Sequence, residues 1–317
     1  MYIYLDIVEH FACQMCGSCC RNDWQVTLDQ ASYQRNAALF AQIGCQEEFG
    51  QAFQVLKGRQ QPGEFAAIAK QPGSTRCWFL TGQNLCRLHA AAGHAHLDTV
   101  CQTYPRYPMT SARGIELTLS FSCPAVLQLL RRNQPLRLMK SEKAPVAFVP
   151  EQYTEQVFPR QKRQSDPLRY YFELEQHVID ILQCRRLTFP ERLELLARTV
   201  RQIDDCGPEE NLGSFLNQLF WHNYDILEAG TAPEETGLTA VILTEHFFVN
   251  FIFKKPFYAY GLQQTVRWLE AFWDRIARHV AAAAPGTEWQ AAQEAIVELE
   301  LRYGHQRSLL LSAGQSG

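Results

Sequence analysis

Apolar residues recur at intervals of three and four along the second half of the chain. The clearest stripes run from Leu168 to Ile181 and from Phe189 to Ile203. This spacing places the apolar side chains on one face of an α-helix, where they can pack against a core. Further helices are predicted over residues 212–227, 239–253, 262–283 and 287–303. Residues 167–317 are therefore predicted to form a C-terminal helical bundle.

Two of these helices carry start signals. Thr188-Phe-Pro-Glu191 is a capping box with a proline inside the first turn, and Thr287-Glu-Trp-Gln290 is a second box without the proline. In such a box the threonine hydroxyl and the Glu or Gln side chain satisfy backbone N–H groups at the helix start. Asp205-Cys-Gly-Pro208 follows the first of these helices and is typical of a helix end.

The first third of the chain has a more broken pattern. Residues 27–40 are predicted to form a capped, alanine-rich helix. Phe49, Phe53 and Leu56 lie at four- and three-residue spacing, which favours one face of a second helix. Both helices fall between Cys20 and Cys77, so this part of the chain is predicted to be helical.

A strand and a linker follow. Leu117, Leu119 and Phe121 alternate with polar residues, which favours a short strand that ends at Cys123, and a helix is predicted over residues 126–130. Residues 133–166 hold four prolines and little periodicity, and this composition predicts a linker. The predicted domains are thus a metal-binding domain over residues 1–132, the linker over 133–166, and a helical domain over 167–317.

Composition limits the possible partners. The chain has 317 residues, is 46% hydrophobic and carries a net charge of −3, as expected of a globular protein with no excess of basic residues. No nucleic-acid partner is predicted. No membrane contact is predicted either, because polar residues interrupt the longest apolar stretch, near residues 241–253. The first ten residues lack the basic start of an export signal, so a cytoplasmic location is expected.

Cysteine is concentrated near the start of the chain. Eight of the eleven cysteines lie within the first 123 residues: Cys13, Cys16, Cys19, Cys20, Cys77, Cys86, Cys101 and Cys123. Disulfides are rare in a reducing cytoplasm, so such a group favours metal binding. Thiolate ligands select zinc or iron–sulfur clusters. The predicted fold is therefore mainly α, with a metal-stabilised, cysteine-rich N-terminal module ahead of the helical bundle, and all eight cysteines are predicted metal ligands.

The first four cysteines follow the pattern Cys13-x2-Cys16-x2-Cys19-Cys20. Three cysteines at two-residue spacing match the first three ligands of bacterial ferredoxin-like clusters. Neighbouring side chains diverge, so Cys19 and Cys20 are not expected to serve one small ion together. A four-iron, four-sulfur cluster or one structural zinc takes four thiolates, so eight cysteines allow two centres or one centre with a mixed site.

The later cysteines occur in separate short motifs. Cys77 and Cys86 flank the turn Thr81-Gly-Gln-Asn84, which predicts a short hairpin with a cysteine on each arm. His89, three residues after Cys86, is a further possible ligand. The remaining three cysteines stand alone and are interpreted as small buried hydrophobic residues: Cys45, Cys184 and Cys206.

Other catalytic templates are absent from the sequence. It contains no G-x-G-x-x-G motif after a predicted strand, no Walker loop, no G-x-S-x-G and no H-E-x-x-H. A metal-free enzyme is therefore not favoured. A structural zinc that folds a loop-rich segment is the simplest alternative, and redox sensing through exposed thiols is a third hypothesis.

Several segments around the cysteines share one resemblance. They are Phe11-Ala-Cys13, Cys19-Cys20 with Trp24 and Leu28-Asp29, Cys77-x-Phe-Leu80, Cys101-x2-Tyr-Pro-Arg106 and Glu116-x-Thr-Leu-Ser-Phe-Ser-Cys123-Pro124. Together they resemble the zinc- or iron-chelating proteins with a Cys-x2-Cys-x2-Cys-Cys signature, and within these the flagellin lysine-N-methylase branch. The resemblance covers residues 8–130 best, and residues 245–253 of the helical half are also similar.

This resemblance implies a protein-lysine N-methyltransferase. It implies methyl transfer from S-adenosylmethionine to the ε-amine of lysines on flagellin or another lysine-bearing protein, with an iron–sulfur cluster involved. The reaction needs a neutral amine in line with the sulfonium carbon, so a base or a desolvated pocket must keep the amine deprotonated. Tyr104 and Arg106, between two predicted ligands, are the candidate catalytic residues. The alternative is a non-catalytic zinc- or iron-binding module whose helical domain binds a partner.

Overall fold

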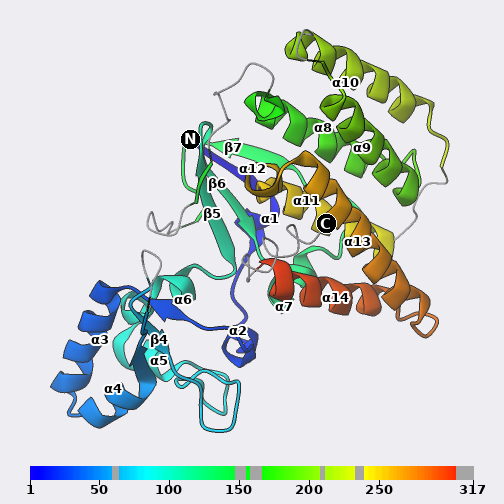
Figure 1. Ribbon diagram of the computed structural model, residues 1–317. Coiled ribbons are helices and arrows are strands. Elements are labelled where there is room, and N and C mark those ends of the chain that lie inside the picture. Colours follow the sequence, from blue (N-terminus) through cyan, green and yellow to red (C-terminus); the bar gives the residue numbers. More distant parts are fainter. Residues whose placement is uncertain (59–63, 147–154, 158–165, 208–210, 233–238, 305–317) are drawn as a thin grey trace.

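The computed structural model describes residues 1–58, 64–146, 155–157, 166–207, 211–232 and 239–304. The protein is mainly helical, with 57% of it in helices and some sheet, which confirms the mainly α prediction. Figure 1 shows three parts: a helical half, a sheet beside it, and a smaller lobe at the opposite end of the sheet. The smaller part holds the described residues between 11 and 104 and is called the cysteine lobe below.

The helical half follows the predicted pattern closely. Its helices are η3 (Pro167–Tyr170), α8 (Tyr171–Gln183), α9 (Phe189–Asp204), α10 (Leu212–Ala229), α11 (Ala240–Phe253), α12 (Pro256–Tyr260), α13 (Leu262–Ala281), α14 (Glu288–Leu299) and the π-helical turn η4 (Glu300–Gly304). Helix α9 begins with the predicted capping box, in which the Thr188 backbone N–H donates to Glu191 Oε2 at 2.7 Å. The second predicted box is wrong. The Thr287 hydroxyl donates back to Ala284 O at 2.7 Å and so does not cap α14.

A five-stranded sheet joins the two ends of the molecule. Its strands are β1 (Tyr2–Leu5), β5 (Arg106–Ser111), β6 (Gly114–Leu119), β7 (Leu138–Ser141) and β8 (Glu155–Val157). The spatial order is β7-β1-β6-β5-β8, with β1 parallel to β6 and antiparallel to β7. The stretch predicted as a linker therefore contributes two strands to this sheet, and residues 147–154 and 158–165 of it lie outside the described residues.

Helix α11 lies at the centre of the core. All of its residues from Ile242 to Phe253 are buried, because the helix packs against β6 as well as α8, α13 and α14. The side chain of Asn250 donates to Leu119 O at 3.0 Å and so ties α11 to the end of β6. One apolar cluster runs from Ile3 in the sheet to Leu299 in α14. The core is therefore shared across residue 132 rather than divided there.

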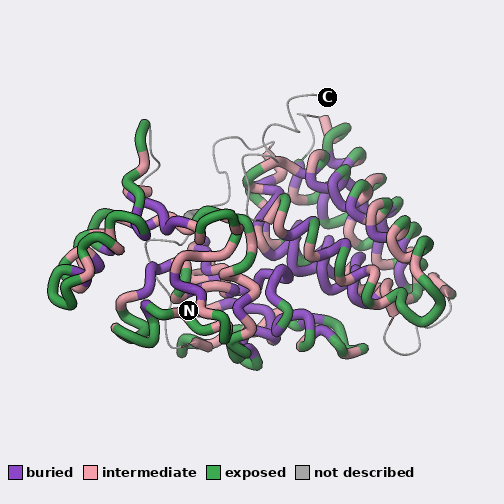
Figure 2. Tube along the Cα trace, turned by 90° about the horizontal axis from the view of Figure 1, so that it is seen from below, coloured by how far each residue is buried: buried purple, intermediate pink, exposed green. Residues whose placement is uncertain are grey.

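The cysteine lobe is built from short elements. They are α2 (Ser18–Arg21), β2 (Thr27–Leu28), α3 (Gln30–Gln42), α4 (Gln46–Ala52), β3 (Phe53–Val55), β4 (Ala66–Ile68), α5 (Arg87–Ala92), the 3₁₀ turn η1 (His94–His96) and α6 (Thr99–Thr103). Two further short helices, α1 (Ile7–His10) and α7 (Pro124–Leu129), lie beside the sheet. The tube in Figure 2 shows more buried residues in the helical half than in the lobe, where intermediate and exposed residues prevail.

Three local predictions for this lobe need correction. The first helix begins after its cap at Asp29 rather than at residue 27, because Thr27 and Leu28 pair with β4. The second helix ends at Ala52, because Phe53 pairs with Ile68 in the strand order β2-β4-β3. The predicted hairpin is an irregular loop, closed by a single bridge between Leu80 and Cys86, without a strand ladder among these described residues.

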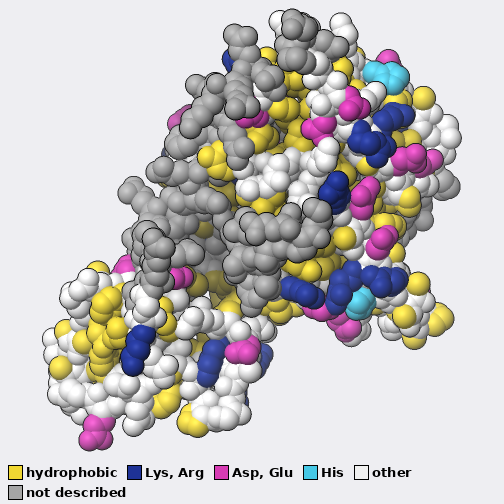
Figure 3. Space-filling model, in the orientation of Figure 1, with side chains coloured by type: hydrophobic (Ala, Val, Ile, Leu, Met, Phe, Trp, Pro, Cys, Tyr) yellow, Lys and Arg dark blue, Asp and Glu magenta, His cyan; other side chains and the backbone are white. Residues whose placement is uncertain are grey.

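The face seen in Figure 3 gives no indication of a strongly acidic or strongly basic partner. There Lys and Arg side chains are interspersed with Asp and Glu along the helical half.

Among the described residues, no helix has both the length and the apolar composition to cross a bilayer. The predicted strand is present as β6, but it ends at Leu119 rather than at Cys123, and the helix predicted over residues 126–130 is α7, which begins at Pro124.

Candidate functional site

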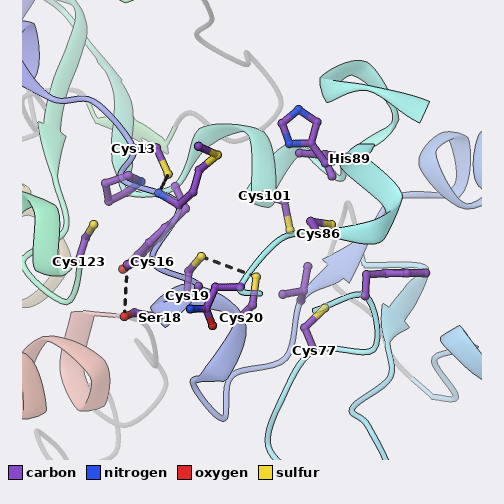
Figure 4. A pocket seen from close by; sticks show the side chains of 18 of the residues that line it. Cys13, Cys16, Ser18, Cys19, Cys20, Cys77, Cys86, His89, Cys101 and Cys123 are labelled. Atoms are coloured by element: carbon purple, nitrogen blue, oxygen red, sulfur yellow. Dashed lines mark hydrogen bonds between the residues drawn. The ribbon is translucent and has the colours of Figure 1, made fainter. Parts of the chain in front are cut away.

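All eight cysteines that were predicted to bind metal line one cavity. This thiol cavity has a volume of about 200 Å³ and lies between the cysteine lobe and the end of the sheet. Its sulfur-bearing residues are Cys13, Cys16, Cys19, Cys20, Cys77, Cys86, Cys101 and Cys123. Figure 4 shows their sulfur atoms around a common space. The chain thus brings together thiols that are separated by up to 110 residues.

The first four cysteines reach the cavity through a tight turn. Strand β1 and helix α1 lead into an irregular segment that carries Cys13 and Cys16, and Gly17 then starts helix α2 with a φ of +71°. A side chain at Gly17 would adopt a left-handed conformation that is unfavourable for other residues, and its Cβ would lie 3.0 Å from Asn84 Cβ. Glycine therefore allows α2 to carry Cys19 and Cys20 into the cavity.

Polar contacts lock this turn to the loop that carries Cys77 and Cys86. The guanidinium of Arg21 donates to Cys16 O at 2.8 Å and to Asn84 Oδ1 at 2.5 Å. The Cys77 backbone N–H donates to Cys20 O at 2.7 Å. These hydrogen bonds join the two cysteine-bearing segments. They position the thiols in addition to the apolar packing.

The remaining cysteines sit at or near helix starts. Cys86 precedes α5 and Cys123 precedes α7, and backbone N–H groups of the first turn donate to each sulfur. Such donors favour a thiolate over a thiol. Cys101 lies inside α6, whose cap is Asp98, and the Val100 N–H donates to Asp98 Oδ2 at 3.0 Å. The helix starts thus orient three sulfurs toward the same space.

The neighbouring cysteines do not diverge as expected. The Sγ atoms of Cys19 and Cys20 lie 3.8 Å apart. The reason is geometric: both belong to one helical turn, where successive side chains are about 100° apart around the axis rather than on opposite faces. Both sulfurs can therefore face the cavity.

These sulfurs also share hydrogen bonds. The Cys20 thiol lies between Cys19 and Cys77, and hydrogen bonding with it lowers the pKa of each of these two thiols to about 7. The same interactions raise the pKa of Cys20 far above its ordinary value. Cys19 and Cys77 therefore ionise more readily than ordinary cysteines, and the thiolate is the form that binds metal.

The other buried thiols are held in the protonated form. Burial raises the pKa of Cys86, Cys101 and Cys123 above the ordinary value of a cysteine. Cys101 has exposed surface although protein surrounds it, because that surface faces the cavity. A soft metal ion would offset this burial by replacing the protons.

The thiols fall into two groups. Figure 4 places Cys13, Cys16 and Cys123 on one side of the cavity and Cys20, Cys77, Cys86 and Cys101 on the other, with Cys19 between them. The electrostatic neighbours of each thiol follow the same division. Within the described part of the chain, no three Cys, His, Asp or Glu side chains meet closely enough to form a metal site. Metal binding by these cysteines therefore stays a prediction.

Comparisons with known proteins give no further information about the thiol cavity. Comparisons of the chain with protein-family models, with curated proteins and with solved structures find no match. The chemistry of the cavity must therefore be inferred from its own residues.

Of the other predicted site residues, some line the cavity and others lie outside it. His89 and Tyr104 line the cavity. Arg106 stacks on the ring of Phe11, with 5.1 Å between the guanidinium carbon and the ring centroid, and its charge acts on Cys13 nearby. The three isolated cysteines pack against the apolar clusters and are partly buried: Cys45, Cys184 and Cys206.

The sequence did not predict a buried chain of hydrogen bonds that starts at Tyr104. Tyr104 Oη lies 3.0 Å from Ser122 Oγ, which lies 2.8 Å from Ser120 Oγ, and Ser120 Oγ donates to Glu300 Oε1 at 3.0 Å. Glu300 also pairs with Lys254. Glu300 is 180 residues from Ser120, so no local pattern could have linked them. The only sequence signal is an acidic residue on the buried side of a predicted helix.

Proposed function

We propose that the thiol cavity binds zinc or an iron–sulfur cluster through its cysteines. The observation that supports this most strongly is the gathering of eight thiols from five separate segments around one space. Thiolates are the preferred ligands of zinc and of iron–sulfur clusters, so thiols that line one space from distant parts of the chain are suited to hold such a ligand. The number of thiols is sufficient for two centres of four ligands each.

The donor chemistry and the closest sulfur pair fit such a ligand. A tetrahedral zinc site with bonds of about 2.3 Å to sulfur separates its sulfur atoms by about 3.8 Å. The Sγ atoms of Cys19 and Cys20 lie 3.8 Å apart. The lowered pKa of Cys19 and of Cys77 makes these two thiols easier to deprotonate on metal binding than ordinary cysteines. Cys20, between them, would lose its proton on metal binding.

The finer proposal is that this centre serves methyl transfer from S-adenosylmethionine to lysine ε-amines of a protein, such as flagellin. Its basis is the resemblance of residues 8–130 to the lysine-N-methylase branch. An iron–sulfur centre held by the eight cysteines would supply the iron chemistry that this resemblance implies. The chain itself supplies an apolar wall with Phe11, Trp24 and Phe79. Such a wall disfavours an ammonium ion and so favours the neutral, nucleophilic amine.

A structural metal is the second candidate. The zinc-like separation of Cys19 and Cys20 favours it, and so does the small size of the apolar cluster in the cysteine lobe. Loop-rich segments of this kind often depend on zinc for folding. In that case the helical half would bind a partner, and the cavity would carry out no reaction.

Metal analysis tests the first part of the proposal. Protein purified without oxygen should contain zinc or iron at stoichiometric levels, and a brown colour with visible absorption would identify an iron–sulfur cluster. The Cys101→Ser variant should lose metal, whereas Cys184→Ser, which changes a cysteine outside the cavity, should retain it. Equal metal content in both variants, or no metal in the wild type, would contradict the ligand assignment.

A methylation assay separates the enzyme from the structural module. Metal-loaded protein is incubated with labelled S-adenosylmethionine and flagellin, and lysine methylation is measured by mass spectrometry. Calorimetric titration with S-adenosylmethionine provides a second measurement that does not depend on the protein substrate. Heat of binding and methyl-lysine support the enzyme. A metal-loaded protein that gives neither signal supports the structural module.

A further inference from the structure

The cavity cysteines are anchored in two different parts of the molecule. Seven of the eight belong to the cysteine lobe, whereas Cys123 follows the sheet. Cys123 is part of the large apolar cluster that the sheet shares with the helical half, and it immediately precedes α7. Cys77 and Cys86 pack against the separate apolar cluster of the lobe. A metal that bound cysteines from both parts would therefore connect two cores.

Four of the lobe cysteines form one set, called the lobe set: Cys20, Cys77, Cys86 and Cys101. Figure 4 shows them together on the side of the cavity away from Cys123. The Cys77 N–H donates to Cys20 O at 2.7 Å, and a bridge between Leu80 and Cys86 closes the loop between them. The Gln71 side chain donates to Cys77 O at 3.1 Å and to Leu80 O at 2.7 Å. These contacts all lie within the lobe, so a metal on this set would stabilise the lobe itself.

A second set, called the junction set, spans the boundary between the lobe and the sheet: Cys13, Cys16 and Cys123. The side chain of Gln14 donates to Gln128 Oε1 in α7 at 2.7 Å. The guanidinium of Arg106 in β5 stacks on the ring of Phe11 at 5.1 Å. Both contacts hold the segment that carries Cys13 and Cys16 beside the part of the molecule that carries Cys123.

One centre cannot use both sets. A tetrahedral zinc with bonds of about 2.3 Å places its sulfur atoms about 3.8 Å apart, and a four-iron cluster also takes only four thiolates. The two sets lie on opposite sides of a cavity of about 200 Å³, with Cys19 between them. Within the described part of the chain no three ligands meet as closely as a metal requires, so metal binding must draw thiols together. Each set can contract on its own side, whereas a single centre would leave the other set without a ligand.

We propose that the thiol cavity holds two metal centres: a lobe centre on the lobe set, and a junction centre on the junction set that fastens the lobe to the sheet. This inference rests on the proposed function, because it assigns the thiols of the same metal-binding site. The lobe centre stabilises the fold of the lobe. The junction centre fixes where the lobe sits, since Cys123 is anchored in the other core. Cys19 lies between the sets and 3.8 Å from Cys20, within reach of either centre.

Paired variants test this division, because each removes two thiols from one set. Full-length protein is purified without oxygen, and its zinc and iron are counted per chain by elemental analysis. The lobe variant is Cys86→Ser with Cys101→Ser, and the junction variant is Cys13→Ser with Cys123→Ser. Each should lose about half of the metal, and the two losses should add up to the wild-type content.

A matched control changes two cysteines outside the cavity. Cys45→Ser with Cys184→Ser removes one thiol beside each apolar cluster and should retain all of the metal. Loss of all metal in either paired variant, or full retention in both, would indicate one centre or other ligands and would overturn the division. The proposed function would survive the first of these results. A wild type without metal would reject the proposed function together with this inference.

Hydrogen exchange and small-angle scattering separate the roles of the two centres. The lobe variant should lose exchange protection over residues 64–104, whereas the junction variant should keep it. The radius of gyration of the junction variant should rise, because the lobe is no longer fastened to the sheet. Protection over α8 and α9 should be retained in both variants, which shows that the helical half is folded. The same loss of lobe protection in both variants, or an unchanged radius of gyration in the junction variant, overturns the inference.

Discussion

The helical half and the cysteine lobe are stabilised in different ways. The helical half shares one large apolar cluster with the sheet, whereas the lobe has a separate cluster with nine buried residues among those that the structure describes, including Phe40, Phe53 and Phe79. Small cores leave little free energy after the cost of ordering the chain. The lobe therefore needs a further source of stability, and the thiol cavity at its base is where a metal would provide it.

Buried polar groups show the same contrast. In the helical half, Glu245 is completely buried and pairs with Arg185 at 2.8 Å and Arg192 at 3.0 Å. In the cavity, thiols face one another, and only the trio around Cys20 is joined by hydrogen bonds between sulfurs. A buried carboxylate with two cationic partners needs no further ligand, whereas a group of like thiols indicates a site that awaits a ligand.

The largest expected effect comes from metal removal. The free energy of binding a structural zinc is about 10 kcal/mol, which exceeds what the small apolar cluster can supply. We expect a chelator to unfold the cysteine lobe and to leave the helical half folded. Hydrogen exchange measured by mass spectrometry should show lost protection over residues 64–104 and retained protection over α8 and α9. Unchanged protection in the lobe would remove the difference between the two regions.

The second effect acts on the helical half. Glu245→Ala leaves Arg192 buried without its carboxylate, which should lower the free energy of unfolding by about 3–5 kcal/mol. The exposed pair Arg275–Glu298 offers a control, because Glu298→Ala should cost less than about 1 kcal/mol. Urea unfolding followed by far-UV circular dichroism measures both. Metal content should stay the same in the two variants, and a parallel loss of metal would mean that the regions are not independent.

A pH effect of intermediate size should also arise in the helical half. Burial, helped by the charge of Arg132, lowers the pKa of His246 to about 4, and burial lowers the pKa of His177 to about 4. An unfolded histidine has a pKa of about 6.5, so the unfolded state takes up protons first as the pH falls. The stabilisation is therefore complete above pH 6.5 and is lost progressively toward pH 4.

Urea unfolding at pH 7 and pH 5 measures this effect. Each histidine should account for a loss of about 2 kcal/mol in the free energy of unfolding between these two values. The His246→Gln variant should retain only the share of His177. The same pH dependence in the variant and the wild type would contradict the assignment to His246.

The smallest effect concerns the capping box of α9. Thr188→Ala removes the threonine hydroxyl from the helix start and should lower the free energy of unfolding by about 1 kcal/mol. Thr287→Ala, at the box that does not form, should have a smaller effect on its helix. Thermal unfolding of the two variants side by side measures the difference. Equal losses would mean that the observed capping contacts add no stability.

Sequence patterns predicted the helical half well because the signals are local. The stripe from Phe189 to Ile203 and the box at Thr188 lie within one helix, and they specify α9 without reference to the rest of the chain. Non-local pairing explains the failures. Phe53 continues a helical stripe but forms a strand with Ile68, and β1 is a short apolar run whose partners, near residues 115 and 140, are far away in the sequence.

For the site, the residue types in the sequence predicted which side chains would gather, but the sequence did not predict how these side chains are arranged. The concentration of eight cysteines predicted that they gather, and all eight line one cavity. The convergence of Cys19 and Cys20 depends on the turn at Gly17, which the spacing alone does not encode. The chain from Tyr104 to Glu300 joins residues that are 196 positions apart, so only the folded structure brings it to light.

The place of β1 inside the sheet has a consequence for synthesis. Tyr2 pairs with Ile115, so β1 leaves the ribosome more than a hundred residues before its partner strand β6 is made. Cys123, the last thiol of the cavity, emerges only after β6. We therefore expect loading of the cavity to finish late in translation, and nascent chains that end before Cys123 to depend on chaperones to shield their apolar first strand.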